Sequence, residues 1–128
     1  MKNHVTPQTA FRLKAAGFPQ PQPELGQVWA NESIRRFIID SKFGEGRYNV
    51  SFPVVTGTRV VSIDPCAYCP DATDILREME IISMSFSARY NKWSVLAMWG
   101  IFLGGDEHPA EAAALAWLAQ NENKSTEQ

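Results

Sequence analysis

A chain of 128 residues and 14.3 kDa has the length of one ordinary domain, which argues against a two-lobed enzyme with a cleft between domains. Hydrophobic residues make up 45% of the chain and charged residues 20%, a balance that predicts a folded protein with a buried core. The net charge of −2 removes the broad electrostatic attraction on which non-specific nucleic-acid binding depends.

The composition also bears on location. The first eight residues lack the apolar region of a signal peptide. The longest uncharged apolar stretch, Val95 to Leu103, is much shorter than the roughly 20 residues that span a bilayer. We therefore expect a cytoplasmic protein with no membrane segment, whose two cysteines stay reduced.

Three helices are predicted from their terminal residues. The first begins at Pro7 behind the hydroxyl N-cap Thr6 and ends at Ala16, because Gly17 can take the left-handed conformation that closes a helix. A stiff proline-rich connector follows at 19–23. The other two helices are expected from about 71 to 80, capped by Asp71 or Thr73, and from 109 to about 120.

Runs rich in β-branched and aromatic residues predict about six strands. Four form a meander, with a turn at 44–46 and a hairpin at 54–63 that turns at 56–58. Two longer strands, 81–86 and 93–102, are expected to form a second hairpin, followed by a loop at 104–108. The order α-β-β-β-β-α-β-β-α predicts an α+β fold: one antiparallel sheet of about six strands with three helices. We expect a single domain over residues 1–120 and a disordered tail over 121–128.

The most suggestive motif for chemistry is Cys66-Ala67-Tyr68-Cys69, because a C-x-x-C pair just ahead of a helix can be held as a thiolate. It looks like the redox motif of glutaredoxins. Folds with that motif place a cis-proline beside the dithiol on a later strand, and this sequence has no proline in a later predicted strand. The predicted meander ahead of the motif also differs from a thioredoxin-like unit. Ordinary loop thiols are therefore the preferred interpretation, and a small thiol-dependent redox enzyme using Cys66 and Cys69 is the alternative.

Metal and acid–base chemistry have weaker support. One C-x-x-C supplies two of the four ligands of a structural zinc, and His4 and His108 lie in parts of the chain that look mobile, so we expect no metal and no cofactor. The carboxylates gather at 71–80 and 106–111, in the first turns of two predicted helices. There they stabilise the helix ends without any substrate.

Charge divides unevenly along the chain, with +3 over residues 1–64 and −5 over residues 65–128. One basic face could bind single-stranded nucleic acid, with bases stacked on Trp29, Phe37 or Tyr48. A solvated sheet surface is the favoured interpretation. The residues of this candidate binding face are Arg35, Arg36, Lys42, Arg47 and Arg59.

Six strings along the chain together carry a resemblance: Thr6–Ala10, Leu13–Pro19, Gly26–Trp29, Ala72–Glu78, Lys92–Trp93 and Pro109–Ala114. They resemble small uncharacterised proteins of intestinal anaerobes, many of them encoded in prophages or other mobile elements. The C-terminal half, a tryptophan strand followed by a Pro-Ala-Glu-Ala-Ala helix, is also similar to the phage domain described as an alpha-beta-alpha sandwich. This resemblance implies a genomic setting and a fold, and it carries over no catalytic residue.

These observations lead to the expectation of a non-catalytic module, related to phages or mobile elements, that binds another macromolecule. The partner would be an unknown protein or a second copy of this chain. A weak homodimer is expected through the apolar strand from Val95 to Phe102, because both of its faces carry apolar side chains.

Overall fold

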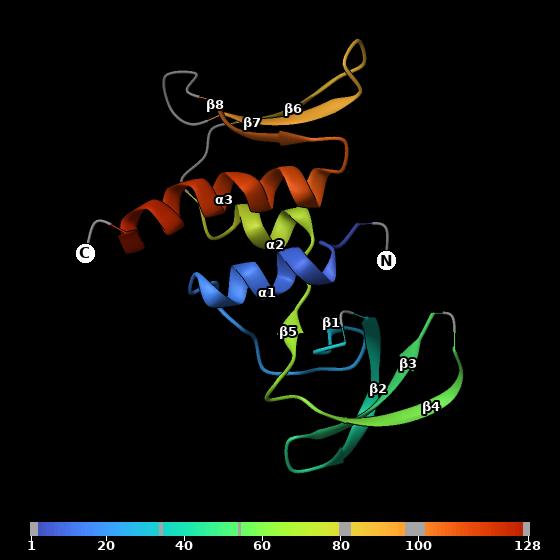
Figure 1. Ribbon diagram of the computed structural model, residues 1–128. Coiled ribbons are helices and arrows are strands. Elements are labelled where there is room, and N and C mark those ends of the chain that lie inside the picture. The colour runs from blue at the N-terminus through green and yellow to red at the C-terminus, as the bar shows by residue number, and fades with distance from the viewer. Residues whose placement is uncertain (1–2, 34, 54, 80–82, 97–101, 127–128) are drawn as a thin grey trace. The chain divides into compact units, whose positions relative to one another are not determined.

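The computed structural model describes residues 3–33, 35–53, 55–79, 83–96 and 102–126. These residues form three helices and eight strands (Figure 1). The α+β class and the antiparallel pairing are confirmed. The elements are α1 (Pro7–Ala15), β1 (Val28–Ala30), β2 (Arg36–Gly44), β3 (Arg47–Phe52), β4 (Val55–Ser62), β5 (Ala67–Tyr68), α2 (Ala72–Leu76), β6 (Ser83–Ser87), β7 (Lys92–Leu96), β8 (Phe102–Asp106) and α3 (Pro109–Thr126).

The prediction of one sheet with about six strands is wrong, because the described strands form two sheets. One has five strands in the order β4-β3-β2-β1-β5, and the other has three in the order β6-β7-β8. The physical reason is that each sheet buries its own apolar cluster. Phe37 and Val50 belong to the cluster of the first sheet, and Val95 packs with Ala112 and Ala116 of α3 in the second.

The chain divides into two compact units, which we describe separately. The N-terminal unit is Thr6–Cys69, and the C-terminal unit joins Met1–Val5 to Pro70–Gln128. Within the C-terminal unit the Val5 N–H donates to the Pro70 carbonyl over 3.1 Å, which ties the start of the chain to its second half. The expectation of a single domain over residues 1–120 stays a prediction.

The first helix is confirmed, and both of its ends are determined by local residues. The Thr6 hydroxyl accepts from the Thr9 N–H, and Pro7 occupies the first turn, where its missing N–H costs nothing. Gly17 follows the C-cap with a φ of +94°, a conformation that favours glycine. Leu13 is fully buried on the inner side of this helix.

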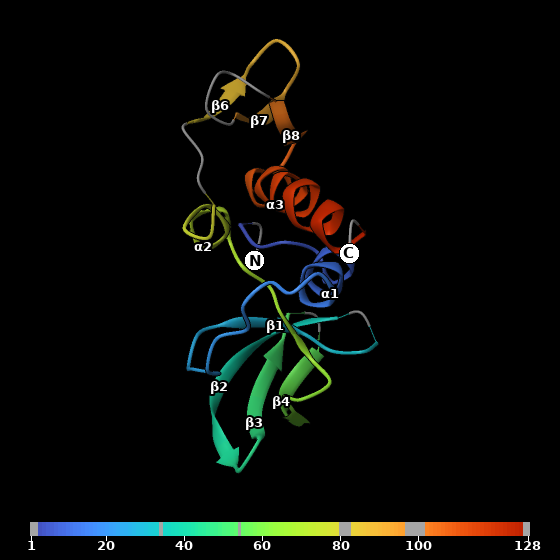
Figure 2. The ribbon, with the colours of Figure 1, turned by 90° about the vertical axis from the view of Figure 1, so that its left-hand side faces the viewer.

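The five-stranded sheet contains the expected meander, and Figure 2 shows β2, β3 and β4 side by side. The predicted turn at 44–46 is confirmed, with Gly46 at a φ of +71°. The hairpin predicted at 54–63 is wrong, because β4 continues from Val55 to Ser62 and pairs along β3. Gly57, with a φ of +90°, lies in the irregular part of this pairing, so it forms a bulge in the strand instead of a turn.

Alternation along the strands determines which side chains face the core of this unit. Phe37 and Ile39 of β2 and Val50 of β3 are buried, and the residues between them are more exposed. Directly opposite residues share a face, so Val61, which pairs with Tyr48, belongs to the same inner face. The other face of the sheet we call the outer face.

The C-terminal unit begins with a shorter helix than predicted. α2 is capped by reciprocal hydrogen bonds between Asp71 and Asp74 and ends at Leu76, four residues before the expected end. The final helix starts at Pro109 as predicted and continues to Thr126, past its expected end near Gln120. α3 contacts α2 as well as strands β7 and β8.

The last strands also differ from the prediction. The hairpin of β6 and β7 is confirmed, with its turn at 88–91. A single strand over 93–102 is wrong, because Leu96 of β7 pairs antiparallel with Phe102 of β8, so the chain reverses between them. Gly104 and Gly105, expected in a loop, are part of β8. Trp117 is buried, Trp93 packs against the Val95 cluster, and Trp99 lies outside the described residues.

This reversal removes the basis of the expected homodimer. The apolar strand from Val95 to Phe102 does not exist as one strand, and Met98 lies outside the described residues. On the sheet face opposite to buried Val95, Ser85, Ser94 and Gly105 lie directly across from one another. That row is small and polar, so the homodimer stays a prediction without the support first given for it.

Candidate functional site

The two cysteines lie directly before and directly after the short strand β5. Cys66 and Cys69 are both buried, and both thiols are free. The Cys69 N–H donates to the Val28 carbonyl, and the Cys66 thiol donates to the Ser62 carbonyl over 3.3 Å. Cys66 also belongs to the apolar cluster of the five-stranded sheet. The structure thus places the pair in the core of the N-terminal unit.

The electrostatic surroundings of Cys66 favour the neutral thiol. Burial raises its pKa from 9.0 to about 11; the Lys14 ammonium partly offsets this effect, and Glu32 adds to it. A catalytic thiol needs the opposite shift, since the thiolate is the nucleophile. Near neutral pH roughly one thiol in ten thousand would be ionised at such a pKa. The surroundings of Cys66 therefore do not favour the redox alternative.

The other groups considered for chemistry are dispersed or engaged in capping. Asp71 and Asp74 form the capping box of α2, as the first-turn interpretation of these carboxylates expects. Among the described residues, no three side chains of His, Cys, Asp or Glu are grouped to hold a metal ion. His108 is exposed, and its N–H donates to the Asp106 carboxylate.

The strand register shows that the five basic residues of the candidate binding face do not share one face of the sheet. Arg59 pairs with buried Val50, so it lies on the inner face of the sheet, and Lys42 pairs with Tyr48 on that same face. Arg36 and Arg47 alternate with inner-face residues and lie on the outer face. Arg35 precedes β2 and is exposed.

The aromatic residues expected to stack with bases are differently placed. Trp29 is 3% exposed, and its indole N–H donates to the Gln27 side chain over 3.0 Å. Phe37 is fully buried, and Tyr48 is half-buried against the same cluster. Two of the three rings are therefore core residues, and neither offers a face to a base.

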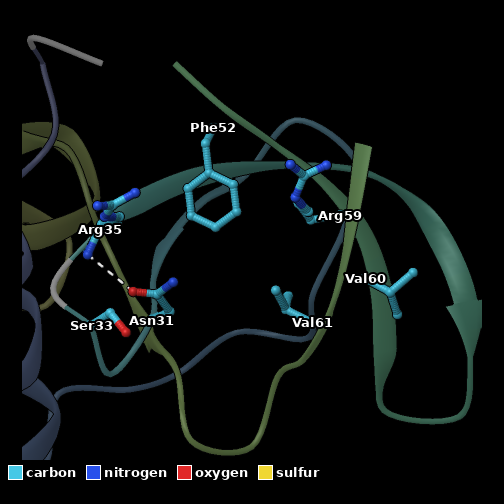
Figure 3. A pocket seen from close by; sticks show the side chains of 7 residues that line it. All are labelled: Asn31, Ser33, Arg35, Phe52, Arg59, Val60 and Val61. Atoms are coloured by element: carbon cyan, nitrogen blue, oxygen red, sulfur yellow. Dashed lines mark hydrogen bonds between the residues drawn. The ribbon is translucent and has the colours of Figure 1, made fainter. Parts of the chain in front are cut away.

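A hollow of about 590 Å³ brings together part of the basic set with residues that the sequence did not single out. The hollow lies between the β1–β2 loop and strand β4 (Figure 3). In this view the Phe52 ring lies between Arg35 and Arg59, and Val60 points away from the others. The lining residues are Asn31, Ser33, Arg35, Phe52, Arg59, Val60 and Val61.

Backbone and ring contacts order both sides of this hollow. In the β1–β2 loop, Asn31 and Arg35 are joined twice: the Arg35 N–H donates to the Asn31 side chain over 3.1 Å, and the Asn31 N–H donates to the Arg35 carbonyl over 3.0 Å. The Phe52 ring packs at 5.6 Å from the buried Phe37 ring. The arginine backbone and the aromatic ring are therefore placed before any ligand arrives.

The hollow is positively charged. In the described part of the chain, no carboxylate forms an ion pair with Arg35 or Arg59, and the Arg59 guanidinium donates to the neighbouring Thr58 carbonyl over 3.4 Å. Glu32 lies in the same loop but does not line the hollow. The N-terminal unit carries seven basic and five acidic side chains, a net charge of +2. Such a site suits carboxylate or phosphate groups, which guanidinium groups bind through paired N–H donors.

Sequence reasoning found the two arginines but missed Phe52, Asn31 and Ser33. Asn31 follows the apolar run Val28–Ala30 and is a turn former, and this is the signal in the sequence for an ordered loop there. No local signal marks Phe52, because its exposure depends on how the sheet curves.

Comparison of the chain with models of known protein families, with curated proteins and with solved structures finds no match. Among the described helices, none is both long enough and apolar enough to cross a membrane. Function is therefore inferred from the residues of the hollow.

Proposed function

We propose that this chain is a non-catalytic binding module, of the type encoded by phages and other mobile elements, and that it holds an anionic segment of another macromolecule in the hollow. The observation that carries the proposal is the pair Arg35 and Arg59, which have no ion-pair partner among the described residues and flank Phe52. Two cations around an aromatic ring can bind acidic groups and the apolar atoms between them.

The chemistry of the lining supports binding instead of catalysis. General acid–base catalysis needs a side chain whose pKa lies near the working pH, and nucleophilic catalysis needs an activated hydroxyl, thiol or amine. The hollow is lined by amide, guanidinium, aromatic and aliphatic groups and one exposed serine hydroxyl. No histidine, carboxylate or thiol is among the lining residues to activate that hydroxyl.

Two labelled polyanions test this proposal: poly-L-glutamate and an oligothymidylate, each followed by fluorescence anisotropy. The test variant is R35E/R59E. The matched control is K42E/R47E, which changes the net charge equally at two exposed residues of the same unit that do not line the hollow. We expect the wild type to bind at least one polyanion, the test variant to bind it at least about tenfold more weakly, and the control to stay within about threefold.

Two results would overturn the proposal. One is that neither polyanion binds to the wild type at protein concentrations up to about 1 mM. The other is that both double variants weaken binding equally, which would mean that general charge attraction and not the hollow accounts for it. Circular dichroism of all three proteins checks that they are folded to the same extent.

A further inference from the structure

We infer that the anionic segment is an extended acidic peptide that joins the five-stranded sheet as an antiparallel strand along β4. This inference depends on the proposed function and names the partner of the same hollow. β4 is one of the two edge strands of its sheet, and its described residues from Gly57 to Val60 are all exposed. Addition of a strand to a free edge is a common way for proteins to bind extended peptides.

The pairing of β4 with β3 shows which backbone groups face the free edge. The Ile63 N–H donates to the Gly46 carbonyl over 3.0 Å, and these two residues continue the register in which Ser62 pairs with Arg47. Hydrogen-bonded and non-hydrogen-bonded pairs alternate in an antiparallel ladder. Val61 is therefore bonded to β3, and the N–H and carbonyl groups of Val60 point away from it.

The opposite edge of the sheet supports this use of the alternation rule. On β5 the Cys69 N–H donates to the Val28 carbonyl, so the same rule directs the Tyr68 N–H and the Cys66 carbonyl away from β1. Those are the two groups that receive side-chain partners. Gln20 accepts from the Tyr68 N–H over 2.9 Å, and Lys14 donates to the Cys66 carbonyl over 2.7 Å.

The free part of the β4 edge is short. The Ser62 carbonyl accepts from the Cys66 thiol, and the irregular pairing around Gly57 ends the regular ladder on the other side. What remains is the N–H and carbonyl of Val60, with the Ser62 N–H next to them. An added strand would therefore exchange its main hydrogen bonds with Val60.

Side chains of the added strand would face the hollow at every second position. Arg59, Val60 and Val61 all line the hollow; Arg59 and Val61 lie on the inner face of β4, and Val60 lies on the outer face and is 46% exposed. Strand neighbours on one face contact each other. A peptide that carries its acidic and apolar residues together at every second position has them on one face. That face would place carboxylates near the arginines and an apolar group near Phe52.

Single-stranded nucleic acid fits these observations less well. Its phosphates would suit the arginines, but Trp29 and Phe37 are buried and cannot stack with bases. A nucleic acid also lacks the regularly spaced amide groups that would pair with Val60. The observations therefore favour a peptide.

The probe for this inference is the heptapeptide SETVTES, acetylated, amidated and labelled with a fluorophore. Its two glutamates and its valine share one strand face, and its two threonines lie on the other. In an antiparallel strand beside β4, the threonine N–H groups point towards β4, one of them at the Val60 carbonyl, and the valine N–H points away. We therefore compare the parent peptide with one N-methylated on both threonines and one N-methylated on the valine.

We expect threonine methylation to weaken binding at least about tenfold and valine methylation to change it by less than about threefold. The protein variant V60P removes the outward N–H and leaves the two arginines of the hollow unchanged. Its affinity for the parent peptide should fall by a similar factor. Equal affinity for all three peptides would overturn strand addition, and so would tighter binding of oligothymidylate than of the parent peptide. If the three peptides bind equally but depend on Arg35 and Arg59, the proposed function stands and only the strand geometry fails.

Discussion

The two edge strands of the five-stranded sheet carry their outward backbone groups in different surroundings. On β5, Gln20 accepts the Tyr68 N–H and Lys14 donates to the Cys66 carbonyl. On β4, no described residue is bonded to the Val60 N–H or carbonyl, and the residues from Gly57 to Val60 are exposed. Proteins usually protect edge strands against pairing with other chains.

The difference indicates that the two edges have different roles, the β5 edge in stability and the β4 edge in binding. The β5 edge lies beside the core cysteine and is closed by polar side chains of α1 and of the connector behind it, which contributes to stability. The β4 edge lies beside a cationic hollow, and the bulge at Gly57 limits how far a second strand could pair along it. We therefore expect changes at β5 to alter folding and changes at β4 to alter binding.

The largest expected effect separates two neighbouring positions on β4. V61P removes an N–H bonded to β3, so we expect it to lower the free energy of unfolding by about 3 kcal/mol or more, or to prevent folding. V60P removes an N–H that faces the free edge, so we expect a loss of at most about 1 kcal/mol. Urea denaturation measures both, and equal losses would contradict the assigned alternation.

Removing the Lys14 hydrogen bonds at the β5 edge is expected to have the next largest effect on stability. The Lys14 ammonium donates to the Asp64 and Cys66 carbonyls, at 3.0 Å and 2.7 Å. K14M keeps the aliphatic stem and removes these bonds, so it should cost about 2–3 kcal/mol of stability. K42M, at an exposed lysine on β2, is the control and should change stability by less than about 0.5 kcal/mol. A K14M variant as stable as K42M would show that the hydrogen bonds of Lys14 do not stabilise the β5 edge.

Alkaline pH tests the buried thiol that joins the ends of β4 and β5. The pKa of Cys66 is raised to about 11, so between pH 9 and 11 the unfolded chain releases this proton while the folded chain keeps it. The contribution of Cys66 is therefore fully present below pH 9 and is lost as the pH rises towards 11, by about 2 kcal/mol. Urea denaturation at pH 8 and pH 10.5 should show this extra loss in the wild type and not in C66A. Parallel losses in the two proteins would mean that Cys66 is not the group responsible.

The parts of this fold that could be predicted are those determined by neighbouring residues. Thr6, Pro7 and Gly17 define α1 without help from the rest of the chain. The sequence predicts a turn at Gly57, but glycine tolerates a positive φ in either a turn or a bulge. Only pairing with β3, more distant in the chain, decides for the bulge.

Long-range pairing also explains the error at 104–105. Gly104 and Gly105 have low strand propensity, yet they belong to β8 because Val95 and Ser94 pair with them. At the site, charge identified Arg35 and Arg59, but only the register shows that Arg59 shares the inner face with Val61, whereas Arg47 does not. The sequence could therefore name the charges of the site but not their grouping around Phe52.

Amide hydrogen exchange of Val60 and Tyr68 tests the contrast between the two edges most directly. In the free protein we expect the Tyr68 amide to be protected by Gln20 and the Val60 amide to exchange almost as fast as an unstructured one. Addition of the parent peptide should slow exchange at Val60 by at least about tenfold and leave Tyr68 unchanged. A Val60 amide as protected as that of Val61 in the free protein, or one unaffected by bound peptide, would contradict the account.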